Sequence, residues 1–133
     1  MQLNVFRTLW GVTTPWQQTV SELQSVGCCG IEARVPLTTE EQRTLARRLE
    51  ASALQYIAIV FSGGGVIPAQ AETPAQHLER LKERFAAAKA LNPRFVNLLA
   101  GNDRWPLAQQ VDFLGRAHEL AAEYELLCSF ETH

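Results

Sequence analysis

The sequence predicts an α/β fold, a partial (β/α)8 TIM barrel with about five parallel strands and four helices. Two observations favour this class. Short β-rich runs alternate with stretches of helical period along the 133 residues, a pattern typical of right-handed crossovers and a parallel sheet. One face of the β-rich runs also turns polar, whereas the strands of an open sheet with helices on both faces are apolar throughout. The interior of a barrel accepts polar side chains near a site.

The predicted strands are short blocks of β-branched, aromatic and other apolar residues. They cover residues 3–12, 30–35, 55–61, 94–100 and 126–131. In three of these runs polar residues alternate with apolar ones, so they share one face of the sheet. The polar members are Glu32, Arg34, Asn97, Ser129 and Glu131.

Four stretches between the runs repeat apolar residues at helical spacing, so each is expected to bury one face. The expected faces are Trp16, Val20, Leu23 and Val26; Leu45, Leu49 and Ala53; Leu78, Leu81, Phe85 and Ala88; and Leu107, Val111, Leu114 and Ala121. Three helix starts carry the residues of a capping box, a side chain that accepts from the first free amides and a partner three positions later. These pairs are Thr14 with Gln17, Thr38 with Glu41, and Thr73 with Gln76.

The number of elements is about half that of a complete barrel, which has eight strands and typically about 250 residues. Residues 1–133 are therefore expected to form a single incomplete barrel domain, the N-terminal half of a longer protein. The alternative is a flavodoxin-like open sheet that binds a phosphate ligand on its strand-end loops. The polar strand faces count against it, as does the distance from "SGGG" (62–65) to the next helix start, near Pro74.

Composition excludes several classes of function. The net charge is −2 and no tail of like charges is present, so nothing indicates nucleic-acid binding. No apolar run has the length of a membrane span, and the first residues do not resemble a secretion signal. Cys28, Cys29 and Cys128 are an odd set with an adjacent pair, a poor disulfide framework, and this indicates reduced thiols and a cytoplasmic location.

Glu131 and His133 are candidate site residues because they end the last predicted strand. In α/β folds that end of the sheet is where sites are built, and a glutamate there can bind a metal or transfer a proton. A solvated strand end is the alternative. Glu32 lies on the same predicted face; an ion pair with Arg34 is the favoured interpretation, since a buried charge needs a partner.

The loops after the strands supply further candidates. Asp103 and Trp105 follow the fourth run, and Trp10 ends the first; each is either a pocket residue or a turn and packing residue. "SGGG" is interpreted as a flexible loop at the mouth of the barrel. His77 is expected to be exposed in the first turn of the third helix, and it is expected to be structural, as is His118.

Three segments resemble the xylose isomerase-like barrels, specifically the sugar phosphate isomerase/epimerase group. They are "GCCGIEARVP" (27–36), "VNLLAGNDRW" (96–105) and "SFETH" (129–133), in the order of that family's second, fourth and fifth strands. The resemblance spans the whole chain. It implies a (β/α)8 barrel that shifts a proton next to a sugar carbonyl through an enediolate, with a divalent metal such as Mg²⁺ or Mn²⁺.

Carried over to this chain, the resemblance makes Glu131 a catalytic residue and a metal ligand. It makes His133, Asp103, Trp105 and Glu32 substrate contacts, and Trp10 is a further candidate wall of the substrate pocket. The expected substrate is a small sugar or sugar phosphate. One departure is Leu99, where relatives often have a histidine or another polar residue.

The other departure concerns the remaining metal ligands, which should come from later strands. One carboxylate does not hold Mg²⁺ or Mn²⁺, which take about six oxygen ligands. The chain alone is therefore expected to be inactive and to bind no metal well. The alternative function is a non-catalytic half-barrel module that self-associates through its open strand edges.

Overall fold

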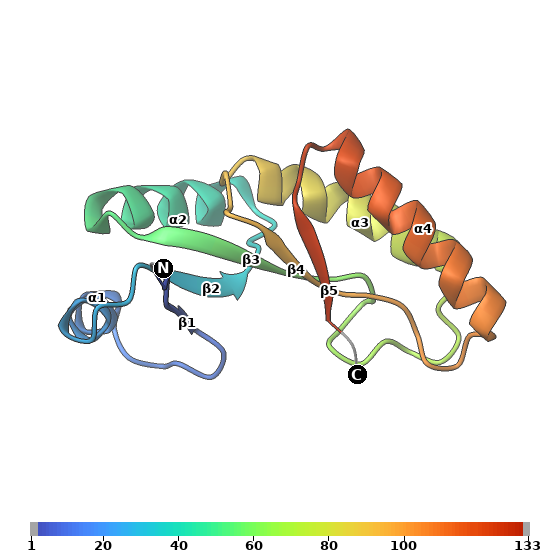
Figure 1. Cartoon of the computed structure of the whole chain (residues 1–133), viewed down its shortest axis with the longest axis horizontal. Coiled ribbons are helices and arrows are strands. Elements are labelled where there is room, and N and C mark those ends of the chain that lie inside the picture. The colour runs from blue at the N-terminus through green and yellow to red at the C-terminus, as the bar shows by residue number, and fades with distance from the viewer. Residues whose placement is uncertain (1–2, 132–133) are drawn as a thin grey trace.

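The computed structural model describes residues 3–131, which form five strands and four helices in strict alternation. In chain order they are β1 (Phe6–Thr8), α1 (Trp16–Ser25), β2 (Gly30–Arg34), α2 (Thr39–Ser52), β3 (Gln55–Phe61), α3 (Pro74–Lys89), β4 (Val96–Leu99), α4 (Leu107–Glu123) and β5 (Cys128–Glu131). The sheet has the order β1-β2-β3-β4-β5, and every neighbouring pair is parallel (Figure 1). The predicted partial barrel is confirmed.

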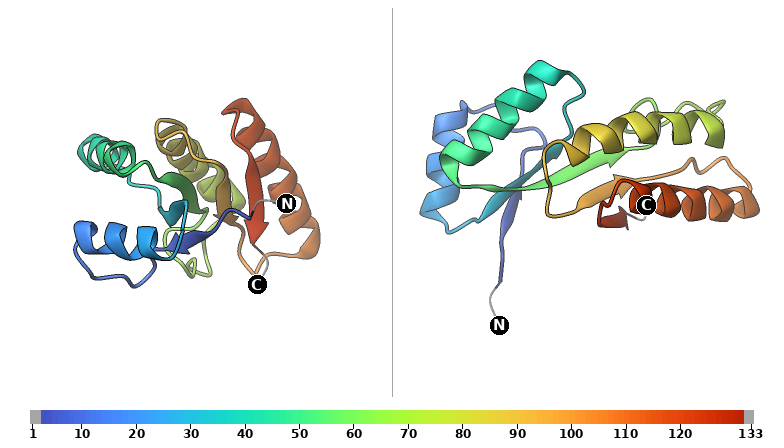
Figure 2. Two further views of the ribbon diagram at one scale, coloured as in Figure 1. Left: turned by 60° about the vertical axis from the view of Figure 1, so that its left-hand side comes forward. Right: turned by 90° about the horizontal axis from the view of Figure 1, so that it is seen from above.

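The helices lie on one side of a curved sheet and form an arc around it (Figure 2). No described helix covers the opposite, concave face of the sheet, and β1 and β5 are its edges. This one-sided cover is the arrangement of a barrel wall, in which the inner strand face is directed at the interior. It explains why the inner positions of the strands tolerate polar residues.

Alternate residues of each strand point to opposite faces of the sheet, so β3 divides into two sets. Tyr56, Ala58 and Val60 join the core between sheet and helices. Ile57, Ile59 and Phe61 lie on the other set of positions and are nearly inaccessible to solvent. β3 therefore supplies both the centre of the core and an apolar stripe along the middle of the concave face.

The helix faces agree with expectation in α3 and differ in α4. Leu78, Leu81, Phe85 and Ala88 of α3 are buried as predicted. In α4 the prediction is wrong for three of four residues: Leu107, Val111 and Leu114 are 76%, 62% and 37% exposed. The buried set is Phe113, Ala117, Leu120 and Ala121. This helix carries two apolar stripes, and the core takes the one that contains Phe113. Val26 after α1 is also exposed rather than buried.

Two of the three expected caps are present. Thr73 and Gln76 form a complete capping box at α3, and the Thr38 side chain accepts a hydrogen bond from the Glu41 amide at α2. The expected box at α1 is wrong, because Pro15 occupies the N-cap position and has no side chain that can cap. The Thr14 hydroxyl instead lies 2.8 Å from the hydroxyl of buried Thr19.

Gly30 opens β2 at a place where no side chain fits. A Cβ atom there would overlap the Gln55 carbonyl oxygen and the Phe6 ring, on the two neighbouring strands. The small residue in "GCCG" is thus explained by close strand packing. The three cysteines are free thiols in the structure, and burial raises the pKa of the Cys128 thiol to about 11, so this thiol is a poor nucleophile. Within residues 3–131, no helix is long and apolar enough to span a membrane.

Candidate functional site

The concave face carries layers of side chains set by the strand register. One layer contains Thr8, Glu32 and Ile57; the next Arg34, Ile59, Asn97 and Ser129; and the third Phe61, Leu99 and Glu131. Each layer contains one apolar residue of β3, the central strand of the sheet. Polar groups therefore lie on both sides of this stripe, from β2 on one side and from β4 and β5 on the other.

Asn97 connects the two predicted carboxylates across this face. Its side-chain Nδ2 donates to Glu131 Oε2 at 3.0 Å and lies 3.4 Å from Glu32 Oε1. The Ser129 hydroxyl lies 3.4 Å from Asn97 Oδ1, which orients the carboxamide with its nitrogen toward the carboxylates. Glu32 is half-buried and Glu131 is exposed. The structure thus brings Glu32 and Glu131 together through a side chain that sequence reasoning had used only as a marker of polarity.

The expected ion pair between Glu32 and Arg34 is wrong. The Arg34 guanidinium instead lies over two aromatic rings, 4.6 Å from the centroid of Trp10 and 4.8 Å from that of Phe61. The two rings are 5.9 Å apart and tilted by 59°. Contact with aromatic faces stabilises the cation without neutralising its charge. Trp10 remains 52% exposed at the carboxyl end of the sheet, where a ligand can reach it.

A metal ion does not fit the described residues on their own. Glu32 and Glu131 are bridged by an amide nitrogen, and residues 3–131 contain no group of three histidine, cysteine, aspartate or glutamate side chains arranged to hold one. Divalent cations of the expected kind need more oxygen ligands than this. His133, the other predicted residue of the motif, lies outside the described residues.

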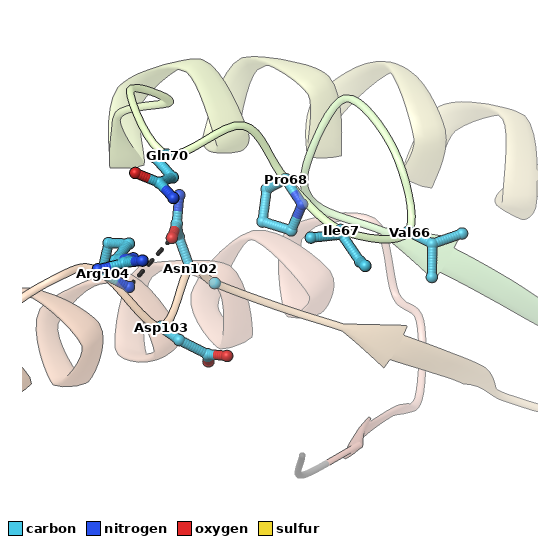
Figure 3. A pocket seen from close by; sticks show the side chains of 8 residues that line it. Val66, Ile67, Pro68, Gln70, Asn102, Asp103 and Arg104 are labelled. Carbon is cyan, nitrogen blue, oxygen red and sulfur yellow. Dashed lines mark hydrogen bonds between the residues drawn. The ribbon is translucent and has the colours of Figure 1, made fainter.

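Asp103 lies away from the concave face, in a hollow between the loop after β4 and the loop before α3 (Figure 3). This hollow has a volume of about 290 Å³. Buried Asn102 fixes its floor, because its Nδ2 donates to the Ala69 carbonyl at 3.0 Å and its Oδ1 accepts from the Arg104 amide at 3.1 Å. The Asp103 carboxylate is exposed at the rim, and Ile67 opposite is 88% exposed.

Trp105 lies apart from these groups. Its ring is buried against His77 and Phe113, at centroid distances of 4.7 Å and 5.1 Å. Its indole Nε1 donates to the Glu72 carbonyl at 2.9 Å, so its one polar group is already satisfied. These contacts are those of a packing residue that fixes the loop before α3 against α4.

Sequence reasoning missed a buried polar network at the same end of the sheet. His77, expected to be exposed, is fully buried, with Nδ1 2.9 Å from Ser62 Oγ. The Gly101 amide donates to the same Oγ at 2.9 Å, so the hydroxyl hydrogen is free to be donated to Nδ1. Nε2 then carries the ring proton, 3.1 Å from Glu72 Oε2. A signal existed in the sequence, since His77 shares a helix face with Leu81 and Phe85.

This network resembles a serine–histidine–carboxylate relay in composition only. Ser62 and His77 are inaccessible to solvent, so no substrate reaches the hydroxyl. Burial lowers the pKa of His77, which keeps the ring neutral. Burial would raise the pKa of Glu72, but hydrogen bonds from the Gly64 and Ala69 amides outweigh it, and the net direction is downward. We therefore assign the network to holding the strand-end loops.

Comparison with known proteins finds solved structures with a similar fold. No protein-family model matches the sequence, and no curated protein matches it either. Three solved structures are similar: a xylose isomerase domain protein from Planctomyces limnophilus (19% identity, TM-score 0.66), an IolI protein with a bound zinc atom (12%, 0.68) and an L-ribulose 3-epimerase (16%, 0.69). They cover 98%, 96% and 97% of this chain, respectively.

The chain spans about half the length of these structures, 53%, 51% and 49% of each. Its fold is therefore that of part of a TIM barrel like those of these structures, and the resemblance inferred from "GCCGIEARVP", "VNLLAGNDRW" and "SFETH" is confirmed at the level of the fold. At these identities the likeness extends to architecture alone.

Proposed function

We propose that residues 1–133 are one incomplete domain, the N-terminal part of a sugar isomerase or epimerase barrel. In this proposal the whole protein moves a proton next to the carbonyl of a small sugar or sugar phosphate. The observation that carries it is the pair of carboxylates on the concave face, Glu32 and Glu131, joined by Asn97. The three similar structures include an epimerase and a xylose isomerase domain protein, which agrees with the proposal.

The proposed chemistry follows from the positions of these groups. The exposed Glu131 carboxylate removes the proton from the carbon beside the carbonyl. The C–H electron pair forms the C=C bond of an enediolate, and the carbonyl π electrons move to oxygen. Isomerisation results when Glu131 returns the proton to the former carbonyl carbon and the hydroxyl proton of the neighbouring carbon passes to the former carbonyl oxygen. Epimerisation results when a second acid of the whole protein gives a proton to the opposite face of the carbon that lost its own, and the carbonyl forms again. Asn97 Nδ2 donates to Glu131 and holds the base in position.

We propose that the reaction of the whole protein depends on a divalent metal, and that this chain alone does not hold one. One of the similar structures is described with a bound zinc atom, whereas the described residues of this chain do not make a metal site. We therefore assign any metal site to Glu131 together with ligands from outside this chain. The proposal places the protein in the reducing cytoplasm, where three unpaired thiols persist.

The test is solvent exchange by the whole protein. Each of a panel of aldoses, ketoses and their phosphates is incubated in D₂O, and loss of the proton beside the carbonyl is followed by ¹H NMR. Glu131→Gln should slow exchange by about 10²–10⁴-fold, the usual contribution of a positioned base. Glu123→Gln, at an exposed glutamate of α4, is the matched control and should leave exchange unchanged. Undiminished exchange in Glu131→Gln would remove the assignment of the base.

A second candidate function is favoured by a separate observation. Leu107, Val111 and Leu114 form an exposed apolar stripe on α4, which faces away from the core. Together with the open edges at β1 and β5, it suits a non-catalytic half-barrel that self-associates. Light scattering over a range of concentrations distinguishes the two. A monodisperse dimer of this chain favours the module, whereas open-ended aggregation favours a part of an enzyme.

A further inference from the structure

Arg34 differs from Arg7 and Arg80 in what surrounds its guanidinium. Arg7 pairs with Glu22 at 2.7 Å, and Arg80 pairs with Glu72 at 2.6 Å. The Arg34 guanidinium has no such carboxylate partner among residues 3–131, although Glu32 is two residues away on the same strand. An exposed cation that is held in place but left unneutralised is available to an anion from solution.

The two rings hold Arg34 in place. The Cζ atom of its guanidinium lies over both the Trp10 ring and the Phe61 ring. The edge of a guanidinium presents two parallel donors, the geometry that binds a carboxylate or phosphate with two hydrogen bonds. Contact with the rings also limits the conformations of a long side chain, so less entropy is lost when the anion binds.

The space beside Arg34 suits a small anionic group. A cavity of about 180 Å³ is lined by Arg34, Phe61, the turn 63–65 and Arg84, with apolar residues between them. The glycines of this turn bring no side chains into it. Arg84 donates to the Phe61 and Gly63 carbonyls and so fixes the turn while adding a second positive charge.

Two acidic side chains near this cavity already have hydrogen-bond partners. Glu72 accepts from the Gly64 amide at 3.0 Å and from Arg80, and so lies behind the turn. Glu41, which lines a separate hollow on the other side of Arg34, accepts from the Thr38 hydroxyl at 2.6 Å. The lining of the cavity itself carries two charged groups, Arg34 and Arg84, and both are positive.

We propose that Arg34, held against Trp10 and Phe61, binds the phosphate group of a phosphorylated sugar at the mouth of the barrel. This inference rests on the proposed function for the sugar, while recognition of phosphate rests on the Arg34 cluster alone. Arg34 is on β2 and Glu131 on β5, three strand intervals or roughly 14 Å apart along the sheet and closer across its concave face. A phosphate held at β2 would direct the carbonyl end of the sugar toward β5.

Binding can be measured on this chain without any turnover. Fructose 6-phosphate and fructose, which differ in the phosphate, are titrated at low ionic strength, and tryptophan fluorescence reports binding beside Trp10. Wild type should bind fructose 6-phosphate and not fructose, and inorganic phosphate should compete. Arg34→Gln should weaken binding by about tenfold or more, since a charge-assisted pair of hydrogen bonds is lost. Arg34→Lys, which keeps the charge and loses the planar fork, should fall between.

The matched control is Arg116→Gln. Arg116 is likewise exposed, but it lies on α4 and lines neither the cavity nor the hollow beside Arg34. It should bind fructose 6-phosphate as wild type does. Equal weakening in both variants, retained binding in Arg34→Gln, equal binding of fructose, or no binding by folded wild type would each overturn the inference.

The outcomes also separate this inference from the proposed function. Phosphate binding that depends on Arg34, in a whole protein without proton exchange on any sugar, leaves the anion site standing and removes the isomerase. If the whole protein exchanges protons on unphosphorylated sugars and Arg34→Gln does not change the rate, the isomerase stands and the phosphate site at Arg34 is removed. Glucuronate, which offers a carboxylate instead, tests the assignment to phosphate, and tighter binding of glucuronate than of fructose 6-phosphate would overturn it.

Discussion

Ser62→Ala is expected to destabilise the chain strongly, although it removes a single oxygen atom. The Ser62 hydroxyl is fully buried at the end of β3, where it accepts from the Gly101 amide at 2.9 Å and lies 2.9 Å from His77 Nδ1. Alanine leaves both groups without a partner inside the protein. Each buried group left unsatisfied costs about 1–3 kcal/mol, so the two together should lower the free energy of unfolding by about 2–6 kcal/mol.

This loss is a large part of the total free energy of unfolding of a domain, which is usually about 5–15 kcal/mol. Urea unfolding followed by the fluorescence of buried Trp105, which packs on His77, measures it directly. With a slope of about 2 kcal/mol per molar urea, the middle of the usual range, the midpoint should fall by about 1–3 M. Ser21→Ala is the control, because that exposed hydroxyl bonds only to the Gln17 carbonyl of its own helix. It should stay within about 0.5 kcal/mol of wild type. A change equally small in Ser62→Ala would refute the assignment of the network.

Two further predictions concern the pH dependence of folding and the exposed stripe of α4. Because burial lowers the folded-state pKa of His77, the unfolded chain binds its proton first as pH falls. The stability that neutral His77 contributes should be fully present above the ordinary pKa of 6.5 and should decline as the pH falls below it. Urea unfolding at about pH 7.5 and 5.5 measures this decline. His77→Gln should make the decline smaller, whereas the control His118→Gln should leave it unchanged. Val111→Lys, at a position 62% exposed, should change stability by less than about 0.5 kcal/mol and suppress any association seen by light scattering.

The fold could be predicted from the sequence wherever local pattern and burial agree. The segment of β3 carries one β-rich run, and the segment of α3 carries one apolar face at helical spacing. With no competing pattern in either segment, the structure follows the prediction. α4 carries two stripes, and local periodicity does not rank them. The choice depends on Phe113 meeting His77 and Trp105, which come from other elements.

For the candidate site, the sequence predicts where residues lie on the sheet but not which side chains they contact. Alternation along a strand places Glu32 and Glu131 on one face, and their positions could be anticipated. What each one contacts could not, because Asn97 reaches Glu32 across β3, a relation of 65 residues in sequence. Arg34 shows the limit most clearly. Its neighbour in sequence, Glu32, suggests an ion pair, whereas Trp10 from the loop after β1 supplies the contact that forms.

The most direct test of the central proposal is to read the coding DNA that follows the codon for His133. If this chain is the N-terminal part of an enzyme barrel, the frame continues for about 120 residues, the remainder of a typical barrel, and these supply acidic and histidine side chains at predicted strand ends. A stop codon directly after His133 would contradict that account. Glu131 would then lack catalytic partners, and the self-associating half-barrel would become the better description.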